Sequence, residues 1–190
     1  MISLPTKIIR DWTAVLLLAG AVLLCGFPAA AQPEKEATPG GSWSQDKRYQ
    51  DHGDGTVTDT KTGLMWLKQD SFQRTGNWLD WLEAFTYIKE LNEDGFAGYS
   101  DWQLPMVNDL QTLFEKGKTN SRQVGHEMVI HIDPIFDKEG SGAWWSLEPN
   151  GHFNAFGVEF NNGNRFSAPK KSKARKAIRA MRVATSPAHP

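Results

Sequence analysis

The sequence has almost no cysteine and no excess charge of either sign. Cys25 is the only cysteine among 190 residues, which excludes an internal disulfide framework and a Cys-based zinc site. Lysine and arginine number 21 against 22 aspartate and glutamate, so the formal net charge is −1. General nucleic-acid binders carry a large basic excess, and no nucleic-acid partner is therefore predicted.

Long apolar runs are missing after the first thirty residues. The one such run, Trp12–Phe27, follows Lys7 and Arg10 and precedes Ala29-Ala30-Ala31. A short positive region, an apolar core and small residues before a cleavage point are typical of a signal peptide. We therefore expect cleavage of residues 1–31, no transmembrane segment afterwards, and export to the periplasm or outside the cell.

Two alternatives to this export signal stay open, a lipidated Cys25 and an uncleaved anchor. Leu24 precedes the cysteine, where lipidation sites carry Gly, Ala or Ser. Residues 32–45 are rich in Pro, Gly, Ser and charge, which predicts a flexible lead-in. Apolar and aromatic residues then recur over residues 46–185, and we predict one domain there, followed by a polar tail over residues 186–190.

The remaining sequence is rich in aromatic residues and mixes helical with strand patterns. Apolar spacing predicts helices over residues 77–92, with Asn77 as N-cap, and over residues 106–115. Alternation and turn signals predict short strands elsewhere. These are residues 56–58, 64–68, 143–147, 158–161, 164–167 and 178–183. Strands at both ends with two helices between them favour an α+β fold.

Several motifs occur in a fixed order between about residues 49 and 184. Asp51-His52-Gly53-Asp54-Gly55-Thr56-Val57-Thr58-Asp59 stands first, Tyr99-Ser100-Asp101-Trp102-Gln103-Leu104-Pro105 follows the first helix, and Trp144-Trp145-Ser146 and Arg179-Ala180-Met181-Arg182 come later. Together they resemble the Lcl C-terminal domain family, named for the C-terminal module of a Legionella collagen-like adhesin.

This resemblance implies a C-type-lectin-like fold, in which short antiparallel strands form a curled sheet with two helices and a long irregular loop region. It also implies a binding role, because the founding member is implicated in binding sulfated glycans. One departure concerns Met106, which stands at the entry of the second helix where the family usually has Thr or Ser. The substitution removes a side-chain cap worth about 1 kcal/mol.

Basic residues gather near the end of the domain. The stretch from Arg165 to Arg182 contains no acidic residue, and its middle part, residues 168–178, is predicted to be a flexible loop. We predict ligand binding by Arg165, Lys170, Lys171, Lys173, Arg175 and Lys176, with Trp144 on an exposed face. Such a patch suits acidic or sulfated glycans, because each neutralised charge releases counterions. A solvated loop without a ligand is the alternative.

Two segments have the composition of a calcium site, although the prediction includes no required cofactor. Asp51, Asp54 and Asp59 surround glycines, but an EF-type loop needs oxygen ligands where Gly53 and Gly55 stand, so a tight turn is favoured. Glu148-Pro149-Asn150 is similar to the tripeptide with which mannose-type C-type lectins bind calcium and sugar. Glu148 and Asn150 are accordingly the candidate metal ligands.

No sequence motif points to catalysis. A nucleophile elbow, a phosphate-binding loop and a His-Glu-x-x-His site are all missing from the sequence. The predicted mature chain also lacks the paired cysteines of formylglycine-generating oxidases, which share the C-type-lectin-like superfold. We therefore expect a non-catalytic module that binds an acidic or sulfated glycan. A structural or protein-interaction module of the bacterial envelope is the alternative.

Overall fold

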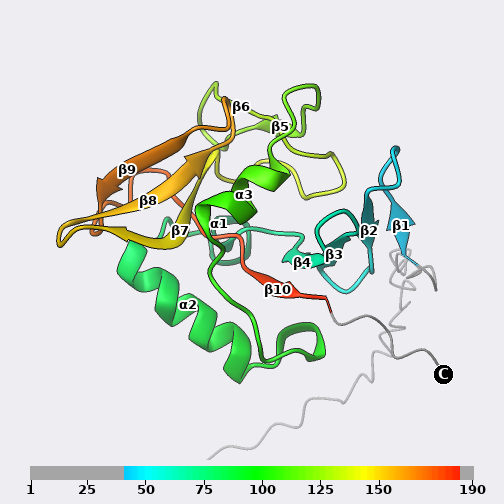
Figure 1. Cartoon of the computed structure of the whole chain (residues 1–190), viewed down its shortest axis with the longest axis horizontal. Helices are drawn as coiled ribbons and strands as arrows, with labels where there is room; N and C mark the ends of the chain where they lie inside the picture. Colours follow the sequence, from blue (N-terminus) through cyan, green and yellow to red (C-terminus); the bar gives the residue numbers. More distant parts are fainter. Residues whose placement is uncertain (1–40, 185–190) are drawn as a thin grey trace, which may run out of the picture. The chain divides into compact units, whose positions relative to one another are not determined.

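The computed structural model describes residues 41–184 (Figure 1). The predicted signal peptide, Cys25 and the tail 186–190 lie outside the described residues. The helices are α1 (Ser71–Thr75), α2 (Trp81–Glu93), the 3-10 helix η1 (Phe96–Gly98) and α3 (Val107–Leu113). The strands are β1 (Ser42–Trp43), β2 (Tyr49–Asp51), β3 (Thr56–Asp59), β4 (Leu64–Leu67), β5 (Ser121–Arg122), β6 (Val129–Ile130), β7 (Ala143–Asn150), β8 (Asn154–Glu159), β9 (Arg165–Pro169) and β10 (Met181–Val183). Few helices and short antiparallel strands confirm the predicted α+β class.

The strands form three small sheets where one curled sheet was expected. The orders are β1-β2-β3-β4-β10, β5-β6 and β7-β8-β9. β1 lies within residues 32–45, so the end of the predicted lead-in belongs to the first sheet. Residues 114–142 contain only the two-residue strands β5 and β6, and they form the long irregular region. No helix among residues 41–184 has the length and apolarity to cross a bilayer.

The first half of β7, Ala143–Ser146, is buried on both faces, which overturns the prediction that Trp144 is exposed. Successive strand residues point to opposite faces, so Trp144 and Trp145 enter different apolar clusters. Trp144 packs in the cluster that contains Leu110 of α3, and Trp145 packs in the one that contains Trp81 of α2. Figure 1 shows α3 and α2 on opposite sides of β7. Both indoles are 0% exposed, and neither is available to stack on a ligand.

The first predicted helix begins three residues later than the apolar spacing indicated. Asp80, not Asn77, is the N-cap of α2, because one carboxylate oxygen of Asp80 accepts the N–H groups of Leu82 and Glu83. The Glu83 side chain in turn accepts the N–H of Asp80. This reciprocal pair satisfies donors that otherwise lack partners at a helix start. It also fixes Glu83 at the end of α2 nearest the predicted ligand residues.

Candidate binding surface

The predicted binding residues lie on β9 and on the segment that follows it, residues 170–176, which we call the basic loop. Its first and last carbonyl groups are both held: Lys170 accepts the N–H of Trp81 at 2.9 Å, and Lys176 accepts the N–H of Leu79 at 3.1 Å. Backbone hydrogen bonds therefore tie both ends of the loop to residues 79–81 at the start of α2, and the flexibility predicted for the residues between these two ends stays a prediction.

The cations of this surface divide into an exposed and a packed set. Arg165, Lys171, Lys173 and Arg175 are exposed. Lys170 and Lys176 are half-buried, and their ammonium groups lie over aromatic rings. The Lys170 nitrogen is 4.9 Å from the ring centre of Trp81, and the Lys176 nitrogen is 5.5 Å from that of Trp145. The packed pair is therefore part of the scaffold that carries the exposed set.

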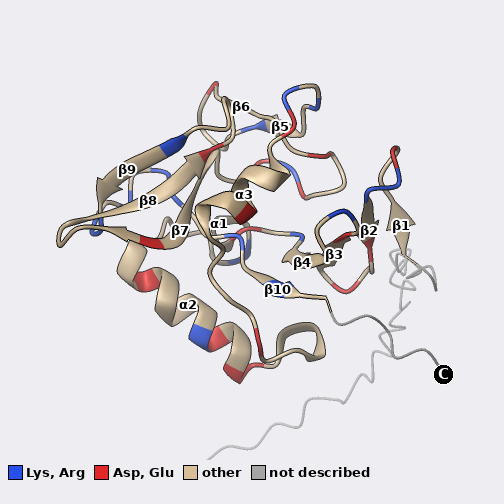
Figure 2. Ribbon diagram, viewed as in Figure 1, with Lys and Arg blue, Asp and Glu red and all other residues tan. Residues whose placement is uncertain are grey.

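Acidic groups from other elements approach the basic loop. Lys173 forms an ion pair with Glu83 of α2, which lowers the pKa of that carboxyl. Burial lowers the pKa of the Lys176 ammonium, and the charge of Glu159 on β8 acts in the opposite direction. Figure 2 shows a basic segment on β9, and acidic segments with a basic one among them along α2. The surface is thus less basic than residues 165–182 indicate by themselves.

The two remaining arginines of the acid-free stretch have structural roles. Arg179 is 1% exposed and donates to the carbonyl groups of Leu67 and Lys68 at 2.6 and 2.5 Å. Burial lowers its pKa to about 10, so it stays charged at neutral pH. Arg182 pairs with Asp101 through two hydrogen bonds, of 2.6 and 3.0 Å. Neither guanidinium is offered to a ligand.

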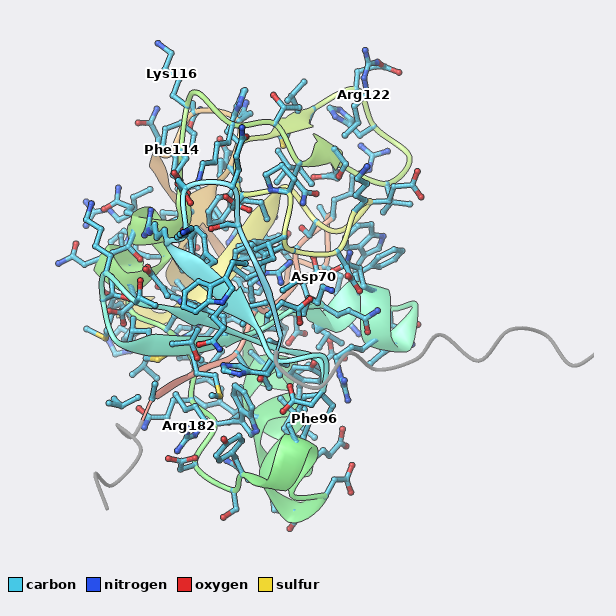
Figure 3. The ribbon with its side chains drawn as sticks, turned by 90° about the vertical axis from the view of Figure 1, so that its right-hand side faces the viewer. Asp70, Phe96, Phe114, Lys116, Arg122 and Arg182 are labelled. Atoms are coloured by element: carbon cyan, nitrogen blue, oxygen red, sulfur yellow. The ribbon has the colours of Figure 1, made fainter. Side chains whose placement is uncertain are left out.

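Asp70 is a buried carboxylate, and among the nearby charges it does most to raise the pKa of Arg179. Figure 3 shows it in the interior at the start of α1, whereas Lys116 and Arg122 project outward at the top of that view. One Asp70 oxygen accepts the N–H of Ser141 at 2.6 Å and the indole N–H of Trp144 at 3.2 Å. Asp70 thereby fixes the entry of β7.

The predicted metal ligands Glu148 and Asn150 have their side chains on different neighbours. The Glu148 carboxylate accepts the N–H of Val107 at 2.8 Å, which caps α3 from β7. The Asn150 amide donates to the Ser167 hydroxyl of β9 at 2.9 Å. Glu148 thus replaces the cap that Met106 does not supply, and the structure does not bring the two residues together as one ligand set.

The aspartates of the first motif have partners within the first sheet and its turns. Asp51 accepts the N–H of Gly53 and pairs with Lys68 at 2.7 Å. Asp54 accepts the N–H of Thr56 at 2.9 Å. These contacts are those of the tight turn that the glycines favoured. In the part of the chain that the structure describes, no cluster of three or more His, Cys, Asp or Glu is arranged to hold a metal ion.

A groove beside β1 is the feature that sequence reasoning missed. Its volume is about 550 Å³, and Trp43, Lys118 and Asp133 are among its lining residues. Trp43 is 49% exposed and is the only exposed Trp among residues 41–184. The Lys118 ammonium contacts three carboxylates, those of Asp46, Glu115 and Asp133. The available signal was a Trp at position 43, inside a stretch otherwise rich in Pro, Gly, Ser and charge.

A family model matches residues 55–182, and its description is the Lcl C-terminal domain. The chain belongs to this family. The Lcl C-terminal domain is associated with an adhesin. This association indicates a non-catalytic surface or binding module, and it also indicates an exported location. The comparison with curated proteins finds no match.

Proposed function

We propose that this Lcl C-terminal domain binds acidic or sulfated glycans through β9 and the basic loop. The observation that carries the proposal is four exposed cations, one on β9 and three on a loop held at both ends; they are Arg165, Lys171, Lys173 and Arg175. A loop anchored at both ends loses less conformational entropy on binding than a free segment of the same length. Neutralising each cation with a sulfate or carboxylate releases counterions, so affinity falls as salt rises.

The test is retention of the chain from Gln32 to Pro190 on immobilised heparin across a salt gradient. The test variant replaces the four exposed cations with Ser and keeps the packed stems of Lys170 and Lys176. A control variant replaces four exposed lysines elsewhere, which are Lys61, Lys89, Lys116 and Lys138. We expect elution above physiological salt for the unmodified chain and the control, and loss of retention for the test variant. Absence of retention in the unmodified chain, or equal loss in both variants, would contradict the proposal.

A protein-interaction module is the second candidate, and the groove at Trp43 favours it. A half-exposed indole beside a cavity of about 550 Å³ offers the aromatic anchor that protein interfaces use. Binding there depends little on salt, in contrast to the basic loop. A partner from envelope extracts that stays bound in high salt, and is lost in Trp43→Ser but not in the four-cation variant, would support this candidate.

A further inference from the structure

We propose that a cavity beside the basic loop receives one anionic ester group of the ligand, carried on a sugar unit that also offers a hydroxyl. This inference rests on the proposed function and gives it a defined point of contact. The cavity has a volume of about 170 Å³ and lies between the basic loop and residues 123–128. Pockets for drug-sized ligands measure roughly 300–1,000 Å³, so this one suits a single sugar unit rather than a longer chain.

Nitrogen donors from two separate loops line the cavity. Arg175 and Lys176 come from the basic loop, and His126 comes from the opposite side. A guanidinium nitrogen of Arg175 lies 3.4 Å from the carbonyl oxygen of Gly125, so the two loops meet at the cavity. The Nδ1 atom of His126 accepts the N–H of Met128 at 3.0 Å. The neutral imidazole therefore carries its proton on Nε2 and has a donor to offer.

Lys176 is a half-buried cation without an ion-pair partner among residues 41–184. Within the described part of the chain, its ammonium donates only to the Ser172 hydroxyl and the Ala174 carbonyl, both at 3.3 Å. Burial without a paired anion lowers the pKa of this group, although the charge of Glu159 offsets part of the effect. An anionic group entering the cavity would supply the missing countercharge.

Arg175 adopts a backbone conformation that arginine normally avoids. Its φ is +51°, in the left-handed region, and the Ser141 hydroxyl donates to its carbonyl at 2.8 Å. Glycine adopts such a conformation without steric penalty. Arginine adopts it at a cost in backbone strain that the surrounding structure must offset. Residues strained in this way concentrate at functional sites.

Two further lining residues specify a sugar rather than a free anion. Glu159 also lines the cavity; its carboxylate limits the negative charge that the cavity accepts, and it can accept a hydrogen bond from a hydroxyl. Phe166 contributes an aromatic wall against which the C–H groups of a sugar ring pack. A ligand with one sulfate-like ester and a neighbouring hydroxyl matches this combination of donors, acceptor and apolar surface.

The experiment is calorimetric titration with three probes: a sulfated heparin disaccharide, the same disaccharide without sulfate, and sodium sulfate. Arg175→Gly removes the guanidinium and relieves the left-handed strain, so its melting temperature is expected to be no lower than that of the unmodified chain. Lys171→Ser is the control, because it removes one exposed charge from the basic loop outside the cavity lining. Lys176→Met is the second cavity variant, since it removes the charge and retains most of the packed stem.

We expect the sulfated disaccharide to bind more tightly than either other probe. Arg175→Gly and Lys176→Met should each weaken its binding by about tenfold or more, the scale of a charged hydrogen bond, and Lys171→Ser by less than about fivefold. Equal losses in all three variants, with heparin retention intact, would overturn the cavity and leave the proposed function standing. Sulfate binding as tight as the disaccharide would overturn the sugar specificity. Absence of heparin retention in the unmodified chain would overturn both.

Discussion

At the scale of single residues, a buried carboxylate holds more of the surrounding structure in place through hydrogen bonds than a partly exposed one. Asp70 is 0% exposed and holds the start of α1, the backbone at Ser141 and the indole of Trp144. Asp80 caps α2 from a partly exposed position. An aspartate is therefore expected to contribute much more to the free energy of unfolding at position 70 than at position 80.

Asp70→Asn tests this difference. The amide keeps one acceptor oxygen but sets an NH2 group among donors, so a buried donor loses its partner and the charge facing Arg179 disappears. We expect a loss of about 2–4 kcal/mol in the free energy of unfolding. Asp80→Asn is the matched control and should change stability by less than about 0.5 kcal/mol, because Asn is as good an N-cap as Asp. Urea denaturation followed by Trp fluorescence measures both, and similar values for the two variants would contradict the argument.

Glu148→Ala separates the capping role from a metal role. Removal of the carboxylate leaves the N–H of Val107 without its partner and should cost about 1 kcal/mol. Because the side chains of Glu148 and Asn150 are engaged on α3 and β9, we expect the melting temperature of the unmodified chain to be the same in calcium and in EDTA. A calcium-dependent rise that disappears in Glu148→Ala would instead establish a metal site there.

At the scale of elements, α2 and the basic loop form one electrostatic unit. Hydrogen bonds join Trp81 and Leu79 to the loop, and the Glu83 carboxylate pairs with Lys173. A carboxylate so placed competes with an anionic ligand for the lysine. The helix therefore both holds the basic loop in position and limits its attraction for polyanions.

Glu83→Gln should strengthen heparin retention, with elution at a higher salt concentration than the unmodified chain. Glutamine retains an acceptor for the N–H of Asp80, so the start of α2 is preserved. Glu90→Gln makes the same charge change seven residues further on, about 10 Å along the helix axis, and should shift elution less. Equal shifts for the two variants would show that only net charge matters.

At the scale of the whole molecule, paired carboxylates make stability depend on pH. Lys118 holds the pKa of Asp46 well below its usual range, and Arg182 lowers the pKa of Asp101. The unfolded chain therefore binds protons at higher pH than the folded one. Stability from these pairs is complete above the ordinary carboxyl pKa of 3.8 and is lost as pH falls through the folded values.

We expect the melting temperature to be steady above about pH 5 and to decline below it. The double variant Asp46→Asn and Asp101→Asn should lose less on acidification, because two of the depressed carboxyls are gone. Both side chains are partly exposed, so raising the salt concentration should also reduce their effect. A decline of the same steepness in the double variant would assign the acid sensitivity to other groups.

Patterns that depend on local spacing were the predictable part of this fold. The turn between β3 and β4, the second helix and the α+β class all follow from neighbours in sequence. The burial of Trp144 was missed because alternation gives the direction of a side chain but not whether both faces of its strand are covered. The role of Glu148 was missed because its partner, Val107, lies 41 residues away. The basic residues of the candidate surface were identified from the sequence. The approach of the Glu83 and Glu159 carboxylates to them was missed, because these two residues lie on other elements.

The last strand of the domain pairs with the fourth. Met181 lies opposite Trp66 in the register of β10 and β4, and the nearby Arg179 donates to Leu67, 112 residues earlier. During synthesis, the first four strands therefore emerge long before the strand that completes their sheet. Contacts of such wide sequence separation slow folding. A nascent chain that stops before Met181 would leave the edge of β4 open to pairing with another chain.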